Sequence, residues 1–251
     1  MLLASAGALW SVQPAVADTQ EAEVLLRAPK YAQENGAKAS APLDAKPDRV
    51  ALPQAPTPIF VPRVSRGAPA LRVGGASRGT NTRVAVRVLV PQYEEAALTA
   101  SDQPAFPWHL SGSTEHSVNF TLVNPDQIDP VIDLTIPGPI RAGFHWIDLS
   151  AHDARLAVGH RYYWFIAIVT NPKRRSADIA ARGSVERVSL AAALAAQIAA
   201  ARPEERAGLF SRAGIWYDAL EATRQLMPGA DAKAQRNALL AQVGIEIEPA
   251  D

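Results

Sequence analysis

Apolar and polar positions alternate between Asn81 and Ser189 in a way that predicts β-strands. Arg83 to Val90 alternates clearly, and Tyr162 to Thr170 is the strongest apolar run. Five shorter runs complete the pattern, at residues 106–111, 117–123, 131–136, 145–149 and 183–188. Turn formers such as Asn124-Pro125-Asp126 separate them, because proline fixes φ and Asn, Asp and Gly tolerate left-handed backbone. Short strands divided by such turns predict an antiparallel β-sandwich over residues 81–189.

One local spacing sharpens this prediction. Leu156, Gly159 and Tyr162 follow each other at intervals of three, at the entrance to an aromatic strand. This spacing is similar to the tyrosine corner of immunoglobulin-like sandwiches, in which the tyrosine hydroxyl bonds to the backbone of the preceding corner. Both faces of the Tyr162 strand are apolar, so we expect it to lie centrally in its sheet or to be covered on its outer face. The expected fold class is therefore α+β, mainly β, with an immunoglobulin-like sandwich.

From residue 190 to residue 251 the apolar period becomes helical. Leu190, Leu194 and Ile198 recur every four residues, which predicts a first helix with Ser189 as its N-cap. Three further helices are predicted to begin at Pro203, Ile215 and Asp231 and to end at Gly214, Met227 and Gly244. These segments form a small C-terminal helical domain. It has two open interpretations: part of a peptide-binding repeat, or a helical cap anchored on the sandwich by Trp216 and Tyr217.

The N-terminal region reads differently. Residues 1–17 combine an apolar run with Ala15-Val16-Ala17 before Asp18, which is typical of a secretory signal peptide, although no basic residue precedes the run. Residues 18–80 are rich in proline and poor in large apolar residues, so they predict a disordered or extended linker. We expect an exported protein, periplasmic or extracellular, and no apolar run is long enough to predict a transmembrane segment.

Composition excludes several classes of function. Lys plus Arg and Asp plus Glu both number 25, so the chain lacks the basic excess of a nucleic-acid-binding protein. There is no cysteine, which excludes disulfides and thiolate chemistry. Five histidines lie in the strand region, but none is spaced from another as two ligands on one element are. The Gly-x-Ser-x-Gly string Gly75-Ala76-Ser77-Arg78-Gly79 lies in the range expected to be a linker, with no predicted strand before it or helix after it, so the sequence predicts no catalytic residue, metal site or cofactor.

The most distinctive string is Gly214-Ile215-Trp216-Tyr217-Asp218-Ala219-Leu220. Together with Arg66-Gly67-Ala68-Pro69, the candidate corner, Arg175-Ser176-Ala177-Asp178 and Gly183 to Val188, it resembles a family of exported bacterial proteins, the domain-of-unknown-function family DUF928. The resemblance extends from Arg66 to Ile247 and departs from the family in the Ala-rich 190–201 segment and the long Pro-rich lead-in. It implies no activity and no catalytic residues.

The expected function is therefore a non-enzymatic interaction or scaffold module of the cell envelope, with an unidentified envelope protein as partner. Candidate contact or anchor residues are Trp108, Trp146, Trp216 and Tyr217, because exposed aromatic side chains anchor protein partners. The alternative is binding of a carbohydrate or cell-wall polysaccharide, since an exposed tryptophan also stacks on sugar rings. A hydrolase is the third possibility, and a pocket that gathers Asp133, His145 and Asp148 would favour it.

Overall fold

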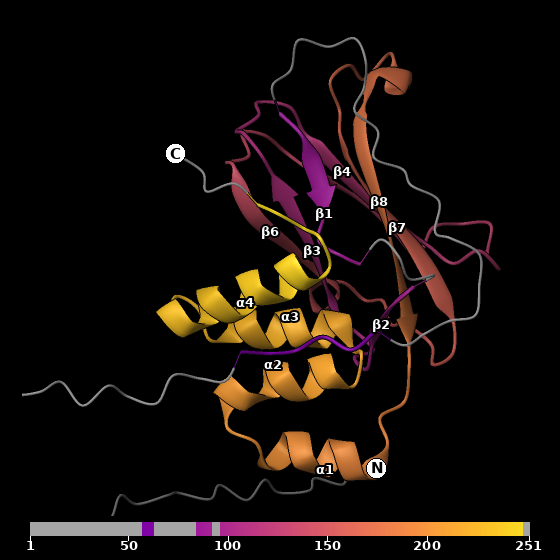
Figure 1. Cartoon of the computed structure of the whole chain (residues 1–251). Helices are drawn as coiled ribbons and strands as arrows, with labels where there is room; N and C mark the ends of the chain where they lie inside the picture. The colour runs from indigo at the N-terminus through magenta and orange to yellow at the C-terminus, as the bar shows by residue number, and fades with distance from the viewer. Residues whose placement is uncertain (1–56, 63–83, 92–95, 248–251) are drawn as a thin grey trace, which may run out of the picture. The chain divides into compact units, whose positions relative to one another are not determined.

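A computed structural model describes residues 57–62, 84–91 and 96–247 of the chain (Figure 1). All described residues belong to one compact unit. The expected signal peptide, residues 1–17, lies outside the described residues. No helix among those described is long and apolar enough to cross a membrane.

Two β-sheets form the larger part of the described structure. The first is antiparallel and orders its strands β1 (Val86–Val88), β3 (Ala105–Leu110) and β6 (Gly143–Asp148). The second orders its strands β2 (Ala97–Thr99), β8 (Ile179–Arg187), β7 (Arg161–Ile168), β4 (Val118–Val123) and β5 (Ile132–Ile136). Seven of the eight strands coincide with predicted runs, and the mainly β character of the fold is confirmed.

Strand β2 is the exception. It pairs with β8 in parallel, with Ala97 opposite Val185. The second sheet is therefore mixed, whereas an antiparallel sheet was predicted. Unlike β1, which lies within the longer run from Arg83 to Val90, β2 has no alternating run around it, and all three of its residues are buried, so no polar position marks an outer face.

The two sheets pack their inner faces together. The ring centroid of Phe106 on β3 lies 5.2 Å from that of Phe120 on β4 and 5.4 Å from that of Trp164 on β7. All three side chains are fully buried. Strand β7 lies centrally in its sheet, as its apolar pattern predicts, although Phe165 on its outer face remains 37% exposed.

Four helices follow the strands in the described C-terminal part: α1 (Ala192–Ala200), α2 (Pro203–Arg212), α3 (Trp216–Gln225) and α4 (Ala230–Gln242). Pro203 is the first residue of α2, as predicted. The predicted caps of α1 and α4 are wrong. Ser189 lies too early, because the Val188 N–H still donates to Thr99 O (2.8 Å) and keeps the chain on the sheet edge. Helix α4 has Gly229 as its N-cap, and Asp231 lies within its first turn.

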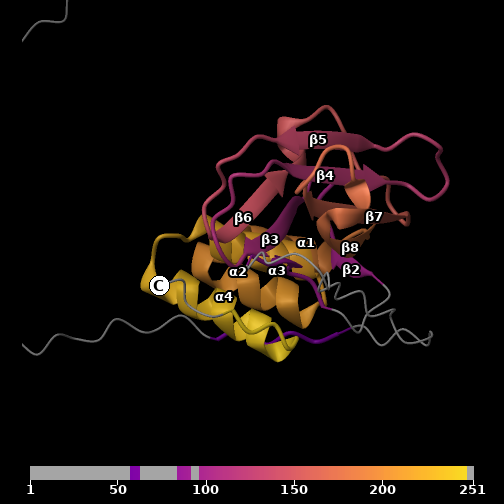
Figure 2. The same cartoon turned by 90° about the horizontal axis from the view of Figure 1, so that it is seen from above.

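Helices α3 and α4, with Phe210 of α2, share one hydrophobic core with the sheets rather than forming a core of their own. Helix α3 contacts β2 and β3. The Trp216 indole N–H donates to Leu89 O (2.8 Å), and the Tyr217 hydroxyl accepts from Trp164 Nε1 (2.7 Å) and donates to Ser184 O (2.9 Å). Figure 2 shows β3 and β6 between the helices and strands β4 and β5. The helical segment thus caps the sheets through Trp216 and Tyr217.

Residues 57–62 fall within the range expected to be a linker, yet they pack on the helices (Figure 1, indigo). Phe60 is 7% exposed, and its ring meets that of Trp216 edge-on at 4.8 Å. Backbone bonds join Val61 N to Ser211 O (3.0 Å) and Phe60 N to the side chain of Gln242 (2.8 Å). Average composition over the whole range hides this, because Phe60 is its one phenylalanine. The rest of the expected linker lies outside the described residues.

Candidate functional site

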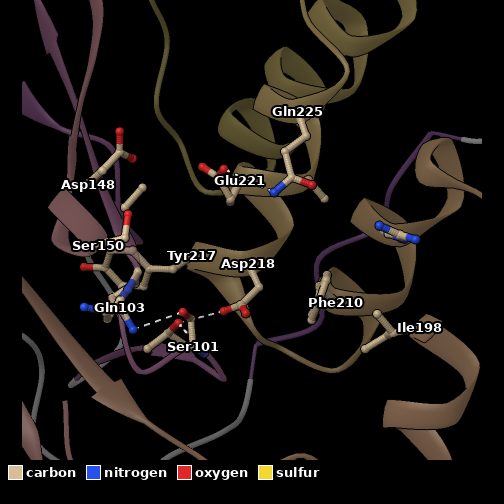
Figure 3. Close-up of a pocket in the computed structure, with 15 residues that line it drawn as sticks. Ser101, Gln103, Asp148, Ser150, Ile198, Phe210, Tyr217, Asp218, Glu221 and Gln225 are labelled. Carbon is tan, nitrogen blue, oxygen red and sulfur yellow. Dashed lines mark hydrogen bonds between the residues drawn. The ribbon is translucent and has the colours of Figure 1, made fainter. Parts of the chain in front are cut away.

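A cavity of about 350 Å³ lies where the helices meet the ends of the strands (Figure 3). Its walls come from three parts of the chain: β2 and the turn that follows it, the end of β6 with the short 3-10 helix η1 (Leu149–Ala151), and helices α1, α2 and α3. Because these parts are distant in the sequence, the cavity exists only once the helices cap the sheets.

Helix α3 provides the most polar wall. Asp218, Glu221, Ala222 and Gln225 line the cavity from positions i, i+3, i+4 and i+7, which fall on one face of an α-helix. Figure 3 shows Asp218, Glu221 and Gln225 projecting from this face. The opposite face of α3 carries Trp216 and Ala219, both fully buried, so core packing fixes how the polar face is turned.

Asp218 faces the cavity but is largely shielded from solvent by the surrounding protein. Its carboxylate accepts hydrogen bonds from the Thr99 hydroxyl (2.8 Å) and the Ala100 N–H (3.0 Å). Burial raises the pKa of Asp218 above its ordinary value, against the lowering effect of these hydrogen bonds. A carboxyl group with a raised pKa in a cavity marks a candidate functional residue.

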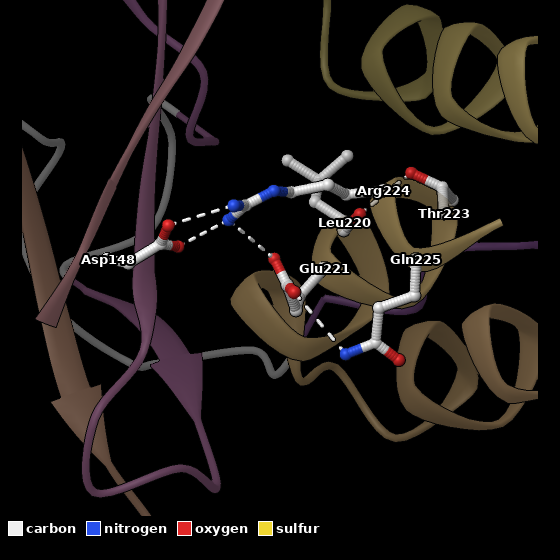
Figure 4. Close-up of polar contacts among 6 residues, drawn as sticks. All are labelled: Asp148, Leu220, Glu221, Thr223, Arg224 and Gln225. Carbon is white, nitrogen blue, oxygen red and sulfur yellow. Dashed lines mark hydrogen bonds and ion pairs between the residues drawn. The ribbon is translucent and has the colours of Figure 1, made fainter. Parts of the chain in front are cut away.

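A guanidinium fixes the other two acids of the cavity (Figure 4). Arg224 binds Asp148 with both Nη atoms, one of them 2.8 Å from Asp148 Oδ2, and lies 3.3 Å from Glu221 Oε2. The hydrogen bonds from Arg224 lower the pKa of Asp148. The pKa of Glu221 is raised, chiefly by burial, although Arg224 opposes this. Bidentate arginine–carboxylate pairs have a specific geometry, so the Arg224–Asp148 pair holds α3 against the end of β6.

The remaining walls are mixed. Helix α2 brings Arg206, whose buried Nε has no hydrogen-bond partner in the described structure, and helix α1 brings Ile198. Phe210 and Tyr217 add apolar surface, and Ser101, Gln103 and Ser150 add neutral polar groups. The cavity therefore offers carboxyl groups, an arginine and an apolar wall to the same occupant.

Of the predicted aromatic contact residues, none is freely exposed. Trp108 is 2% exposed, and Trp216 and Tyr217 are fully buried anchors of the helical cap. Trp146 is half-buried, with the Arg224 guanidinium carbon 5.1 Å from its ring centroid. Of these four aromatic residues, Tyr217 alone lines the cavity. Tyr217 and Trp146 therefore support the cavity wall and its arginine, and Trp108 is packed in the core.

The candidate tyrosine corner has the expected contact. The Tyr162 hydroxyl accepts a hydrogen bond from Ala157 N (3.0 Å), five residues upstream. Leu156 is 1% exposed, and Gly159 has a φ of 77°, which favours glycine. The corner therefore orients the start of β7 and lies apart from the cavity.

The groups considered for a hydrolase do not come together. Asp133 is exposed on β5, where it accepts a hydrogen bond from Thr121 (3.0 Å), and the His145 ring stacks on Trp108 with centroids 4.4 Å apart. Of the three, only Asp148 lines the cavity. Within the part of the chain that the structure describes, no group of three or more His, Asp or Glu side chains is placed to hold a metal ion.

The family model of the Domain of Unknown Function (DUF928) matches residues 73–250. The chain belongs to the DUF928 family. No curated protein matches it. The DUF928 match runs from before β1 to beyond α4, so it includes both sheets, the helical cap and every residue that lines the cavity.

Sequence reasoning found the string that carries the cavity's acids but not the cavity. Asp218 belongs to the Gly214 to Leu220 motif, and Glu221 follows it directly. Helical spacing alone places Asp218, Glu221 and Gln225 on one face. Their partners Thr99 and Asp148 lie far away in the sequence, and nothing in the pattern indicates that they meet.

Proposed function

We propose that this DUF928 protein is a non-enzymatic interaction module of the cell envelope, and that its cavity takes a polar segment of a partner protein. The observation that carries the proposal is the lining of the cavity, where carboxyl groups, an arginine and apolar side chains lie together. A peptide segment presents all three complementary kinds of group. Export, which the proposal includes, rests on the sequence of residues 1–17.

The chemistry of the walls favours a basic side chain at the centre of that segment. Asp218 and Glu221 have raised pKa values because they are buried, so an incoming ammonium or guanidinium stabilises their ionised forms. The unpartnered Nε of Arg206 is a donor that suits a peptide carbonyl. Ile198 and Phe210 provide contact for the aliphatic stem of a lysine or arginine.

Helix α1 extends this surface beyond the cavity. Its nine residues are apolar apart from Gln197, and none is buried. The other described residues leave most of this apolar helix uncovered, and such a surface is suited to a partner. Since Ile198 both belongs to α1 and lines the cavity, the helix and the cavity form one continuous surface.

We also propose that the two sheets form an immunoglobulin-like sandwich. The order β1-β3-β6 corresponds to strands A, B and E of that fold, and β8-β7-β4-β5 corresponds to G, F, C and C′. The Tyr162 bond then falls at the start of strand F, where the tyrosine corner lies in such domains. Strand β2 is an addition paired in parallel with the strand equivalent to G.

The alternatives gain less from the structure. The alternative, carbohydrate binding, requires exposed tryptophans. However, Trp108 is buried, and the Arg224 guanidinium lies over the ring of Trp146. A hydrolase is favoured by one observation, the raised pKa of Asp218 and Glu221 in a cavity. Among the described residues, however, no lining serine hydroxyl is hydrogen-bonded to a histidine or carboxylate that would activate it.

Site-specific photocrosslinking tests the proposal. A photoreactive phenylalanine analogue at Gln225, on the cavity wall, is expected to crosslink to a discrete envelope protein when the full chain is incubated with envelope extract. The same label in a D218N/E221Q background is expected to give at least several-fold less product. A label at the exposed Asp129 is the control. Equal crosslinking from Asp129, or equal yield in the double variant, contradicts the proposal.

A further inference from the structure

A second site is suggested by a buried arginine that has no counter-charge among the described residues. Arg236 on α4 is 7% exposed. Its Nε is buried without a hydrogen-bond partner, and Nη2 reaches only the side chain of Asn237, at the long distance of 3.5 Å. No described carboxylate forms an ion pair with it. A buried, unpaired charge is costly, so this residue calls for an explanation.

The surroundings of Arg236 are cationic and aromatic. Its guanidinium carbon lies 3.7 Å from the ring centroid of Phe144. In the three-stranded sheet, Phe144 is opposite His109, and His109 is opposite Arg87, so the three side chains form a row on one face. His109 is 9% exposed, and its ring meets that of Phe144 edge-on at 5.2 Å.

No described acidic side chain forms an ion pair with Arg87 or Arg236 beside this row. The pKa of His109 is lowered, first by burial and then by the nearby charges of Arg87, His145 and Arg236. His109 therefore remains neutral at pH 7 and adds no charge of its own. Arg87 is exposed, and one Nη atom donates to the Glu246 carbonyl (2.8 Å), which is a neutral acceptor. Two guanidinium groups thus lie near enough to His109 to act on its pKa, and neither forms an ion pair with a described acid.

We propose that Arg236, Arg87 and His109 form a binding site for a small oxyanion, a phosphate or a carboxylate. Guanidinium groups bind such oxygens with two parallel hydrogen bonds, and the Nε and Nη atoms of Arg236 provide the donors. The Phe144 ring holds the guanidinium plane in place. The site shares no lining residue with the cavity, so it goes beyond the proposed function.

Calorimetric titration of the full chain with inorganic phosphate, and separately with acetate, at pH 7 and constant ionic strength tests this site. We expect saturable binding of at least one of them, and the comparison shows whether phosphate or carboxylate is the ligand. R236M is expected to weaken binding about tenfold or more, because it removes charge-assisted hydrogen bonds. R182M is the matched control, since Arg182 also lies over an aromatic ring, 5.3 Å from the centroid of Tyr163, but is exposed on the other sheet.

Two further variants keep the test decisive. Should R236M fail to fold, R87M at an exposed position is expected to weaken binding several-fold. Glu248 and Asp251 follow in the sequence, so the titration is repeated with E248Q/D251N. Absence of saturable binding of either anion, equal affinity in R236M and R182M, or binding that appears only in E248Q/D251N overturns the proposal.

Discussion

Tyr217 is the residue through which helix α3 reaches the five-stranded sheet. Its hydroxyl lies between the Trp164 indole nitrogen and the Ser184 carbonyl, and burial raises its pKa far above the ordinary value. The same helical turn presents Asp218 to the cavity. A fully buried anchor beside a cavity-facing acid therefore fixes where that acid lies.

Replacing Tyr217 by phenylalanine tests this anchor. Y217F leaves the buried Trp164 N–H without its acceptor, and an unsatisfied buried group costs about 1–3 kcal/mol. We expect the free energy of unfolding in urea to fall by that amount. Y163F, on the outer face of the same strand β7, is the control and is expected to change it by less than about 0.5 kcal/mol. Equal effects of the two substitutions would contradict the anchoring role.

Asp218 predicts a specific pH dependence. Its pKa in the folded protein is raised above the unfolded value near 3.8, so the folded state binds more protons above that pH. Stability is then lost as pH rises from about 4 through the raised pKa, with a slope of at most about 1.4 kcal/mol per pH unit. Asp148 acts in the opposite sense, because its lowered pKa removes stability only as pH falls below 3.8.

D218N therefore flattens the loss of stability above about pH 4, because the amide does not titrate. Urea unfolding at several pH values in that range measures the slope for wild type and variant. D129N, at an exposed position, is the control and leaves the slope unchanged. A D218N protein whose slope equals that of wild type would show that Asp218 titrates as an ordinary solvated acid.

At the scale of elements, one glycine on β8 makes room for a buried tryptophan of β7. Gly183 is opposite Trp164, and a Cβ placed on it would lie 2.5 Å from the indole ring. The close contact lets the tryptophan lie flat over β8. No side chain larger than hydrogen fits without moving a ring that is itself fully buried.

G183A is expected to destabilise the protein by about 1–3 kcal/mol, the usual cost of overpacking a core. G208A is the matched control within helix α2. Its added methyl meets only the flexible end of Arg212, at 3.3 Å, and alanine favours a helix over glycine by up to about 1 kcal/mol. We expect G208A to be neutral or stabilising. A melting temperature of G183A at or above that of G208A would refute the packing argument.

Element types were largely predictable from the sequence, and their partners were not. The apolar runs predicted β1 and β3 to β8 because each run is long enough to show its period. Strand β2 has three residues, all buried, so it shows no period at all. The cap of α1 was misplaced because a hydrogen bond from Val188 to Thr99 decides where the sheet ends, and this contact lies outside any local pattern.

For the whole molecule, the sheets, the helices and residues 57–62 share one core. Phe60 packs against Trp216, which is itself bonded to Leu89 in the segment after β1. Composition predicted a linker here because most of residues 18–80 lack large apolar side chains. The cavity was equally hidden, since it requires Thr99, Asp148 and Asp218 to meet across the assembled fold.

F60A is expected to cost about 3–5 kcal/mol, as for other buried phenylalanines. Ile59, the residue before Phe60, is 62% exposed, so I59A is expected to change the free energy of unfolding by less than about 0.5 kcal/mol. Thermal unfolding of both variants measures the difference. A small effect of F60A would mean that residues 57–62 are not part of the folded core.

The central claim is that the cavity binds a basic segment of a protein, and an NMR titration tests it most directly. The probe is N-acetyl-lysine N′-methylamide, which offers an ammonium together with peptide carbonyls, and its glutamate counterpart is the control probe. We predict saturable shifts of the backbone amides of Ser101, Glu221 and Gln225 with the lysine probe alone, and their loss in D218N/E221Q. Absence of saturable shifts, or equal shifts in the double variant or with the glutamate probe, would contradict the claim.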